Sequence, residues 1–392
     1  MRIALSADFH LGIRQFNNQQ RWNDFLDAFV RVVQKVEKLN IDTFVMAGDI
    51  FHRYRPHPGV VRKFLKETSI LDCPIIIIRG NHDSPQVLFE KYGGDTLHLI
   101  RDVSNTVYLN RKKPIYEITN TCFIGLGYVG FKAEQEIKKL VQGITTEAAT
   151  KIGVFHQLLD YPGVPEVNAE VSRGFLKGLD LNYILMGHYH VAYSDENLFN
   201  SGSPEYWAFD QGEQIEVNLD NGEETVKPAK KRGFYVIETD NGKHKFVEIK
   251  PSRPMFLITY KTGNFNEAIH LPRIKEHLEK YNLEGAMVKS VIRGKHKFGR
   301  MNLSKAMILE KPLIHNTAIM LTPSSTLPDT IDTIKTQSEY LIERGINKTE
   351  ACEIAEWLEH NKEKLATMQS TEILEAIREV LSRHQSKNRH DN

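Results

Sequence analysis

The amino-acid sequence predicts an α/β fold for its first 190 residues, with helices covering a mostly parallel sheet. Two observations predict it. Short apolar runs alternate with longer segments in which apolar residues recur every three or four positions, as in successive strand–helix units. The run Ile75–Ile78 has no polar residue, which is typical of a strand buried on both faces. Because 392 residues are many for a single core, two or three domains are expected.

The elements of this first region follow one another along the chain. A helix is predicted from Trp22 because Phe25, Phe29 and their neighbours recur at amphipathic spacing. A second helix follows Pro58 with the same pattern. The predicted strands are residues 2–7, 42–47, 75–78, 121–127, 152–156 and 182–187.

The sequence pattern changes beyond residue 200. Asn-Gly turns between short apolar runs at 200–250 predict antiparallel hairpins that close the first domain. Strands at 255–260 and 286–294 around a helix at 266–281 predict a separate small α/β module. The predicted divisions are a first domain at 1–250, a cap domain at 251–321, a linker at 322–330 and a helical segment at 331–392.

The C-terminal segment predicts two amphipathic helices. Asn347 and Glu350 have the spacing of a capping box. Apolar residues then recur at helical spacing at Ile354, Trp357, Leu358, Ile373, Leu374, Ile377, Val380 and Leu381. Two short helices bury little by themselves, so they either pack on each other or dock on a partner or on the body of the protein.

The composition says more about the cellular compartment of the protein than about its binding partners. Lys and Arg number 51 and Asp and Glu 50, so any nucleic-acid surface must come from local clustering of charge. Three scattered cysteines predict no disulfide framework, which favours a reducing, cytoplasmic compartment. The N-terminus does not resemble a signal peptide, and no run of about 18 apolar residues occurs, so no membrane span is expected.

Polar residues follow five of the predicted strands at the point where each strand ends. They are Asp8 and His10, then Asp49, then Asn81, His82 and Asp83, then His156, and finally His188 and His190. Because ligands bind outside the carboxyl ends of strands in open α/β sheets, we expect these side chains to converge at one edge.

The spacing within two of these groups has a physical reason. In extended backbone, residues two apart face the same way, so Asp8 and His10 are expected to reach one point while Phe9 faces the core. His188 and His190 repeat that spacing. The glycines that precede several of these residues permit sharp turns and close backbone approach.

The residue types in this set indicate a pair of metal ions. Without His82 and Asp83, the set has two aspartates, one asparagine and four histidines, which suit Mn²⁺, Fe²⁺ or Zn²⁺ better than Mg²⁺ or Ca²⁺. Seven ligands fit two ions roughly 3.5–4 Å apart that share a carboxylate, and such a pair hydrolyses phosphate esters. A single Asp or His after a strand is more often a turn residue or a helix cap. The five matches in chain order favour the metal interpretation.

These motifs resemble those of the calcineurin-like metallophosphoesterases and, within them, the archaeal-like branch of the double-strand-break repair nucleases of the SbcD and meiotic-recombination type. The matching stretches are SADFHLG (6–12), MAGDIFHRYRP (46–56), IRGNHDSP (78–85), VFHQ (154–157) and MGHYH (186–190). The resemblance covers residues 1–210, and the later modules match by layout alone. It implies a sandwich of mixed β-sheets flanked by helices, with a small α/β DNA-binding cap and a C-terminal helical segment.

The resemblance implies a ligand set for two Mn²⁺ ions. One ion would be held by Asp8, His10, Asp49 and His190, and the other by Asp49, Asn81, His156 and His188. His82 would face the scissile phosphate, and Asp83 would orient His82 through its second ring nitrogen. His52 matches a family position implicated in exonuclease action, although many relatives carry Asp there.

The resemblance also implies activities and partners. They are 3′→5′ exonuclease action on duplex DNA ends, endonuclease action on single-stranded and hairpin DNA, homodimer formation, and binding of an SbcC-type coiled-coil ABC ATPase through residues 331–392. This implies a nucleoid-associated protein. Dimer helices would lie within 59–70 and 86–100, which are equally compatible with ordinary core. Their apolar residues are Val60, Phe64, Leu65, Leu88, Phe89, Leu97 and Leu99.

Basic clusters are the candidates for DNA contact. Arg53 and Arg55 lie beside the predicted metal ligands. The acid-free stretch 289–300 in the cap contributes Lys289, Arg293, Lys295, Lys297 and Arg300. Residues 111–113 and 227–232 are also basic, although most charge runs are solvated loops.

Two other functions are compatible with parts of the sequence. A metallophosphatase or cyclic-nucleotide phosphodiesterase would use the same ligands but has no need of the cap or the terminal helices. A non-catalytic adaptor would need only the partner-binding segments, and the complete ligand set argues against it.

Overall fold

The computed structural model describes most of the chain. The described residues are 1–84, 94–162, 164, 168–296, 311–323 and 348–360. They form two six-stranded sheets and one five-stranded sheet, with helices on the outer faces. Within these ranges no helix has the length and apolarity that crossing a membrane requires.

The first sheet has the strand order β14-β13-β1-β2-β3-β4. Its strands are β1 (Arg2–Ser6), β2 (Thr43–Met46), β3 (Ile75–Ile77), β4 (Thr106–Tyr108), β13 (Gly233–Glu238) and β14 (His244–Glu248). Strands β1 to β4 are parallel, whereas β13 and β14 add antiparallel at one edge. Every residue of β3 is buried, which confirms the prediction of a strand covered on both faces.

Three helices cover the outer face of the first sheet. They are α1 (Gln19–Lys38), α2 (Pro58–Thr68) and α3 (Thr96–Val103). Helix α1 begins where Asn18 accepts a hydrogen bond from the Gln20 amide, and α2 begins at a proline, which needs no amide partner there. Phe29 of α1 and Phe64 of α2 stack with ring centroids 5.5 Å apart.

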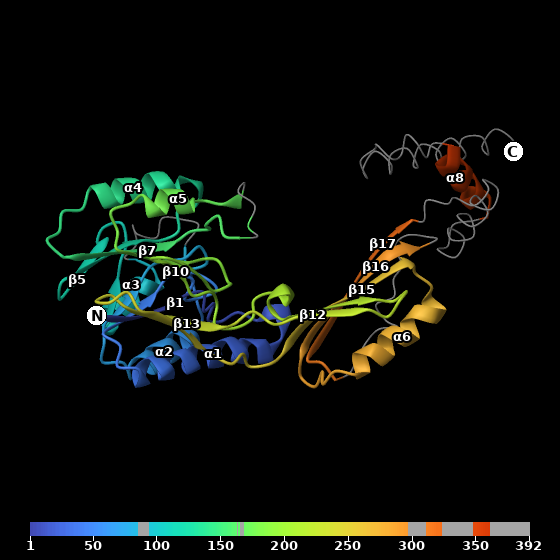
Figure 1. The fold of residues 1–392 in the computed structure, drawn as a ribbon, viewed down its shortest axis with the longest axis horizontal. Coiled ribbons are helices and arrows are strands. Elements are labelled where there is room, and N and C mark those ends of the chain that lie inside the picture. The colour runs from blue at the N-terminus through green and yellow to red at the C-terminus, as the bar shows by residue number, and fades with distance from the viewer. Residues whose placement is uncertain (85–93, 163, 165–167, 297–310, 324–347, 361–392) are drawn as a thin grey trace, which may run out of the picture. The chain divides into compact units, whose positions relative to one another are not determined.

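The second sheet has the order β5-β6-β7-β8-β10-β9. Its strands are β5 (Ile115–Ile118), β6 (Thr121–Leu126), β7 (Thr150–His156), β8 (Tyr183–Gly187), β9 (Tyr193–Asp195) and β10 (Leu198–Asn200). Helices α4 (Ala133–Gln142) and α5 (Arg173–Lys177) cover its outer face. Figure 1 shows α1 and α2 on one side of the two sheets and α4 and α5 on the other.

Residue alternation along the strands places a core between these two sheets. Ile3 and Leu5 of β1 point into it and meet Val154 of β7, whereas Ala4 points to the helices of the first sheet. Layers of helix, sheet, sheet and helix therefore follow one another. This confirms the predicted sandwich of mixed sheets flanked by helices.

The predicted dimer helices pack mostly against the outer face of the first sheet. Val60, Phe64 and Leu97 are buried in the cluster beneath the first sheet. Leu99 is 53% exposed, and Val103, one turn further along α3, is 58% exposed. Leu88 and Phe89 lie outside the described residues.

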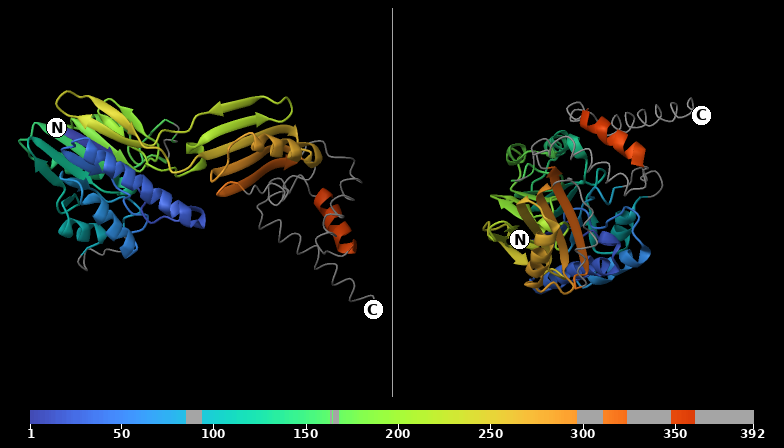
Figure 2. Two further views of the ribbon diagram at one scale, coloured as in Figure 1. Left: turned by 90° about the horizontal axis from the view of Figure 1, so that it is seen from below. Right: turned by 90° about the vertical axis from the view of Figure 1, so that its right-hand side faces the viewer.

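The third sheet has the order β12-β11-β15-β16-β17, with α6 (Glu267–Glu279) against one face (Figures 1 and 2). Its strands are β11 (Glu213–Asn218), β12 (Glu224–Lys227), β15 (Met255–Asn264), β16 (Met287–His296) and β17 (Ile314–Pro323). Hairpin β11–β12 pairs with β15, so it does not close the first domain as expected. Only β13–β14 does so. A turn motif predicts a hairpin but does not specify which strand pairs with it.

The C-terminal segment is described only in part. Helix α8 (Lys348–His360) begins directly after Asn347, where the capping pattern predicted a helix start. The helix predicted through Ile373 and Leu381 lies outside the described residues.

Candidate metal centre

The predicted ligands lie at the carboxyl ends of five strands that come from both sheets of the sandwich. Asp8, Asp49 and Asn81 follow β1, β2 and β3 of the first sheet, and His156 and His188 stand at the ends of β7 and β8 of the second. The convergence was predicted, but at the edge of one sheet. The centre instead lies where the ends of two facing sheets meet.

The seven predicted ligands are brought together in two neighbouring groups. The ligand atoms of Asp8, His10 and His190 lie within 4.8 Å of one another, as do those of Asp49, His156 and His188. The Nε2 atoms of His10 and His190 are 3.1 Å apart. Asn81 joins the second group, since its Oδ1 is 3.2 Å from His156 Nε2.

Asp49 belongs to the second group and also faces His10 of the first. Its Oδ1 accepts a hydrogen bond from the His82 backbone amide at 2.9 Å. Its Oδ2 lies 3.7 Å from His10 Nε2 and 3.4 Å from His156 Nε2, and makes no hydrogen bond. A carboxylate oxygen buried without a partner is costly, and one that faces two imidazole nitrogens is suited to a shared metal ligand.

One ring nitrogen of His156, Nδ1, already makes a hydrogen bond. Nδ1 lies 2.7 Å from the Ala47 carbonyl oxygen, to which it donates, so Nε2 is the atom left for a ligand role. Oxygen and imidazole donors in this arrangement fit a pair of divalent transition-metal ions.

Strained backbone holds several of these side chains in place. Asp8, His10, Asp49 and His188 all have positive φ, at 56°, 46°, 50° and 88°. Such conformations cost free energy and cluster at functional sites. The reasoning that Asp8 and His10 share a point because the chain is extended there was therefore wrong in its cause, although the two side chains do converge.

Glycine is required at two positions beside Asp49. A Cβ on Gly80 would lie 2.0 Å from Asp49 Oδ1, and one on Gly48 would lie 2.3 Å from His156 Nδ1. Gly48 also has a φ of +88°. These contacts confirm the predicted close approach of backbone at the strand ends.

Burial and crowding shift the pKa values of the two aspartates in opposite directions. Burial, together with the charge of Asp49, raises the pKa of Asp8 to about 7 despite the opposing effect of His156. Burial would also raise the pKa of Asp49, but His156 and His10 hold it well below its usual range. Two buried carboxylates this close favour a cation between them.

The pKa values of the histidines are also shifted in opposite directions. Burial lowers the pKa of His10 well below its usual value, and those of His188 and His190 to about 3, so their rings are neutral donors. Burial lowers the pKa of His156 too, but Asp49 outweighs it and raises that pKa to about 9. A bound metal ion would displace the His156 Nε2 proton, because a ligand ring must be deprotonated.

Asp83 does not orient His82, which corrects the role inferred from the resemblance. Its buried carboxylate accepts hydrogen bonds from the backbone amides of Ile50, Phe51 and Gly80 at 2.9–3.1 Å. Asp83 thereby ties the loop after β3 to the loop after β2. Sequence spacing identified a support residue but not what it supports.

His82 is held by the loop after β2. Its Nδ1 lies 3.2 Å from the His52 carbonyl oxygen, and the two imidazoles stack with centroids 4.9 Å apart. The His10 ring meets His82 edge-on at 4.8 Å. His82 and His52 therefore lie beside the predicted ligands, and both are partly exposed.

The predicted DNA contacts are placed only in part. Arg53 and Arg55 are exposed in the loop after β2, and the charge of Arg53, after burial and His82, contributes to lowering the pKa of His52 to about 4. In the cap, Lys289, Arg293 and Lys295 alternate along β16 and so share one face of the strand. Lys297 and Arg300 lie outside the described residues.

Two aromatic residues at the centre were missed by sequence reasoning. The Trp207 ring lies 4.2 Å from that of His10, and the Tyr128 ring lies 5.4 Å from that of His188. Neither belongs to a ligand motif. The aromatic run at 206–209 was the one signal that could have drawn attention to Trp207.

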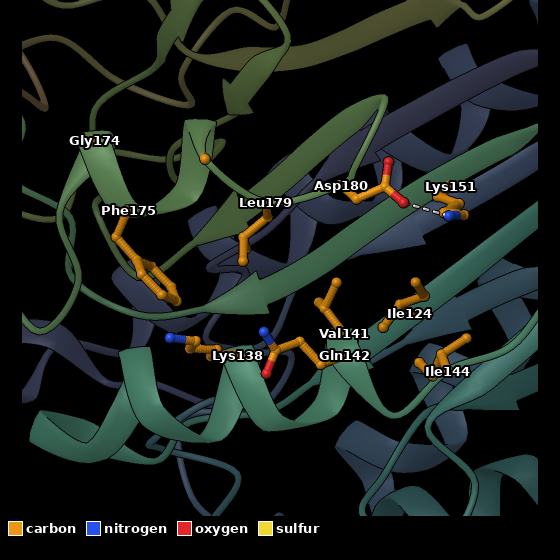
Figure 3. A pocket seen from close by; sticks show the side chains of 11 residues that line it. Ile124, Lys138, Val141, Gln142, Ile144, Lys151, Gly174, Phe175, Leu179 and Asp180 are labelled. Atoms are coloured by element: carbon orange, nitrogen blue, oxygen red, sulfur yellow. Dashed lines mark hydrogen bonds and ion pairs between the residues drawn. The ribbon is translucent and has the colours of Figure 1, made fainter.

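A cavity of about 640 Å³ lies away from this centre, beside α4 and α5 (Figure 3). Lys138 and Gln142 line it from α4 and Phe175 from α5, with the ion pair of Lys151 and Asp180 near one end. None of its eleven lining residues is a predicted site residue.

Comparison with known families agrees with this geometry. The family model described as calcineurin-like phosphoesterase matches residues 1–192, the region that carries all seven predicted ligands. Residues 1–192 are therefore a domain of the calcineurin-like phosphoesterase family.

Individual relatives narrow the comparison. A protein of Methanopyrus kandleri named "DNA double-strand break repair protein Mre11" is 27% identical over 300 residues, which cover 69% of this chain and 61% of the relative. A protein of the same name from Methanococcus maripaludis is 29% identical, over 48% of this chain and 52% of its own. The chain thus spans between half and two thirds of the length of these relatives. Among solved structures, a purple acid phosphatase from yellow lupin seeds aligns over 63% of this chain and 52% of its own at 13% identity, with a TM-score of 0.34.

Proposed function

We propose that this chain is a two-metal DNA nuclease of double-strand-break repair. It hydrolyses phosphodiester bonds, as a 3′→5′ exonuclease on duplex ends and as an endonuclease on single-stranded and hairpin DNA. The observation that carries the proposal is Asp49, whose Oδ2 makes no hydrogen bond and faces His10 of one group of candidate ligands and His156 of the other. The names of the relatives support DNA repair as its setting.

The proposed ligand assignment follows the two groups. Asp8, His10, Asp49 and His190 hold one Mn²⁺ ion, and Asp49, Asn81, His156 and His188 hold the other. Such a pair of ions activates a water molecule and neutralises charge on a phosphoryl group. Asn81 contributes an uncharged oxygen, which limits the negative charge at the centre.

His82 is the proposed proton donor to the leaving oxygen. Its Nδ1–H donates to the His52 carbonyl, so a protonated ring carries its second proton on Nε2. The His82 backbone is fixed by the hydrogen bond that its amide N–H donates to Asp49 Oδ1. Asp83 contributes indirectly, since it fixes the two loops that carry Asp49, His52 and His82. His52 supports His82 through stacking and through its carbonyl oxygen.

DNA contact is proposed for the exposed basic residues. Arg53 and Arg55 lie in the same loop as His52, where they can reach phosphates that flank the scissile bond. The basic stretch 289–300 of the cap, within the proposed cap domain 251–321, supplies a second phosphate-binding surface.

The proposed assembly has two further components. Leu99 and Val103 give α3 an exposed apolar stripe, which supports homodimer formation through this helix. Residues 331–392, beyond the proposed linker 322–330, bind an SbcC-type coiled-coil ABC ATPase, and the complex works at the cytoplasmic nucleoid. Sedimentation of the purified chain, alone and with such an ATPase, tests the homodimer and the ATPase complex. A chain that sediments as a monomer would contradict the homodimer, and one that does not bind the ATPase would contradict the complex.

The test of the activity is a digestion with Mn²⁺ of three substrates. They are 3′-labelled duplex DNA, single-stranded circular DNA and a small phosphomonoester. Cleavage of both DNA substrates is expected. Cleavage confined to the phosphomonoester would make the chain a phosphatase and overturn the nuclease proposal.

One substitution tests the role of His82 as the acid independently of metal binding. His82→Ser is expected to lower cleavage by about 10²–10⁴-fold while Mn²⁺ binding stays normal. His57→Ser is the matched control, because His57 caps α2 through a side-chain acceptor that serine also supplies. Normal cleavage by His82→Ser would remove His82 from the mechanism.

A further inference from the structure

The indole of Trp207 covers one side of the candidate metal centre. Its ring centroid lies 4.2 Å from that of His10, with the planes 34° apart, and 4.7 Å from that of His190. His52 and His82 lie further off, at 5.9 and 6.0 Å. Trp207 therefore touches two side chains of the Asp8 group most closely.

The ring of His10 lacks the usual support of a metal-ligating histidine. Such a ring normally donates from its second nitrogen to a carboxylate or carbonyl, which fixes its plane, as His156 does through Ala47. His10 Nδ1 is buried and has no hydrogen-bond partner. The orientation of the His10 ring must therefore come from the side chains that pack against it, and Trp207 is the nearest aromatic ring among the described residues.

The backbone of Trp207 is fixed on both sides. Its amide donates to Gln211 Oε1 at 2.9 Å, and its carbonyl oxygen accepts from the side-chain amide of Gln15. Gln15 in turn accepts a hydrogen bond from Arg21 Nε at 3.0 Å. The indole is thus tied to α1 at the point where the helix begins.

A buried network of charges fixes the residues just before Trp207. The Arg21 guanidinium is fully buried and contacts Asp24 at 2.8 Å, Glu205 at 3.3 Å and the Tyr206 carbonyl oxygen at 2.8 Å. Arg253 forms a bidentate pair with Asp24 at 2.6 and 2.8 Å. Two arginines and two carboxylates balance, so the network is rigid and satisfied.

We propose that Trp207 is a positioning residue for the metal ion that Asp8, His10 and His190 would hold. It fixes the plane of the His10 imidazole in place of the missing hydrogen bond, and packs the His190 ring in the same way. The inference rests on the metal centre of the proposed function but not on its substrate. The other ion, beside His156, does not depend on Trp207.

The test is calorimetric titration with Mn²⁺ of the full-length wild-type chain and three variants. Trp207→Leu is expected to bind one of two Mn²⁺ ions about 10-fold or more weakly, since loss of a group that orients a ligand costs about 10–100-fold. Trp207→Phe, which keeps an aromatic ring, is expected to restore most of the affinity. Phe209→Leu is the matched control, because Phe209 lies in the same segment and its ring contact is with Phe16.

Thermal unfolding in EDTA separates positioning from folding. Trp207→Leu and Phe209→Leu are expected to unfold at similar temperatures, while only the former loses affinity for one ion. Unchanged affinity for both ions in Trp207→Leu would overturn the inference, as would an equal loss in Phe209→Leu. A wild-type chain that binds no Mn²⁺ would instead overturn the metal centre, and this inference with it.

Discussion

Two clusters built around histidine, both within the part of the chain that the structure describes, differ in whether their polar atoms are satisfied. In the third sheet, His277 of α6 has both ring nitrogens occupied: Nδ1 lies 3.0 Å from the Tyr260 hydroxyl and Nε2 lies 3.1 Å from Glu224. The other Glu224 oxygen accepts from Tyr281. At the strand ends, His10 Nδ1 and Asp49 Oδ2 are buried and make no hydrogen bond, although Asp49 Oδ2 lies 3.4 Å from His156 Nε2.

This difference separates a structural cluster from a functional one better than residue type does. Both clusters combine imidazole with carboxylate, but Glu224 is exposed at the surface whereas Asp8 and Asp49 are buried. A satisfied network rigidifies the protein, whereas buried polar atoms left unpaired need something that is not part of the chain. The cluster around His277 needs no ligand, and the cluster around Asp49 does.

The largest expected effect is that of Asp49→Asn, which removes the shared charge. Loss of an outer partner of a metal ligand costs about 10–100-fold in affinity or activity, so loss of the bridge should cost at least about 100-fold in cleavage with Mn²⁺. The wild-type chain should also gain about 2.7 kcal/mol of stability when Mn²⁺ is present at 100 times its Kd. Asp49→Asn should lose that gain, as measured by urea unfolding with and without Mn²⁺.

The convergence of the candidate ligands could be predicted from the sequence because each of them follows a strand end. The element that positions Asp8 or His156 is local, so the order of short motifs suffices to place the ligands together. The sequence did not predict contacts between residues that are far apart along the chain. The hydrogen bonds of Asp83 to the loop after β2 and the contact of Trp207 with His10 depend on tertiary packing, which no spacing encodes.

The fold shows the same division. Apolar runs predicted β1, β2, β3, β6, β7 and β8, since a buried strand can be recognised from a short run of apolar residues. They did not show that the β11–β12 hairpin joins β15 through β11, because antiparallel hairpins look alike whichever sheet they join. The satisfied cluster around His277 was also invisible, since its members come from β12, β15 and α6.

A smaller effect is expected at the satisfied cluster from His277→Ala. The substitution leaves the Tyr260 hydroxyl buried without its partner, which should lower the free energy of unfolding by about 1–3 kcal/mol. Because no metal is involved, the loss should be the same with and without Mn²⁺. A double-mutant cycle with Tyr260→Phe should show that the two losses do not add. A loss that depends on Mn²⁺ would mean that the two clusters are coupled.

The smallest effect is expected from Tyr281→Phe, and it depends on pH. The Tyr281 hydroxyl donates to Glu224 and is the largest cause that lowers the pKa of this carboxyl below its usual 4.5. A lowered pKa in the folded state contributes stability above 4.5, and that contribution is lost as pH falls through the folded value. Near pH 7 the variant should therefore open α6 more easily by about 0.5–1 kcal/mol, measured by amide hydrogen exchange. The difference should shrink toward pH 4, roughly the usual carboxyl pKa. A difference that stays constant over this range would show that Tyr281 acts through packing and not through its hydrogen bond to Glu224.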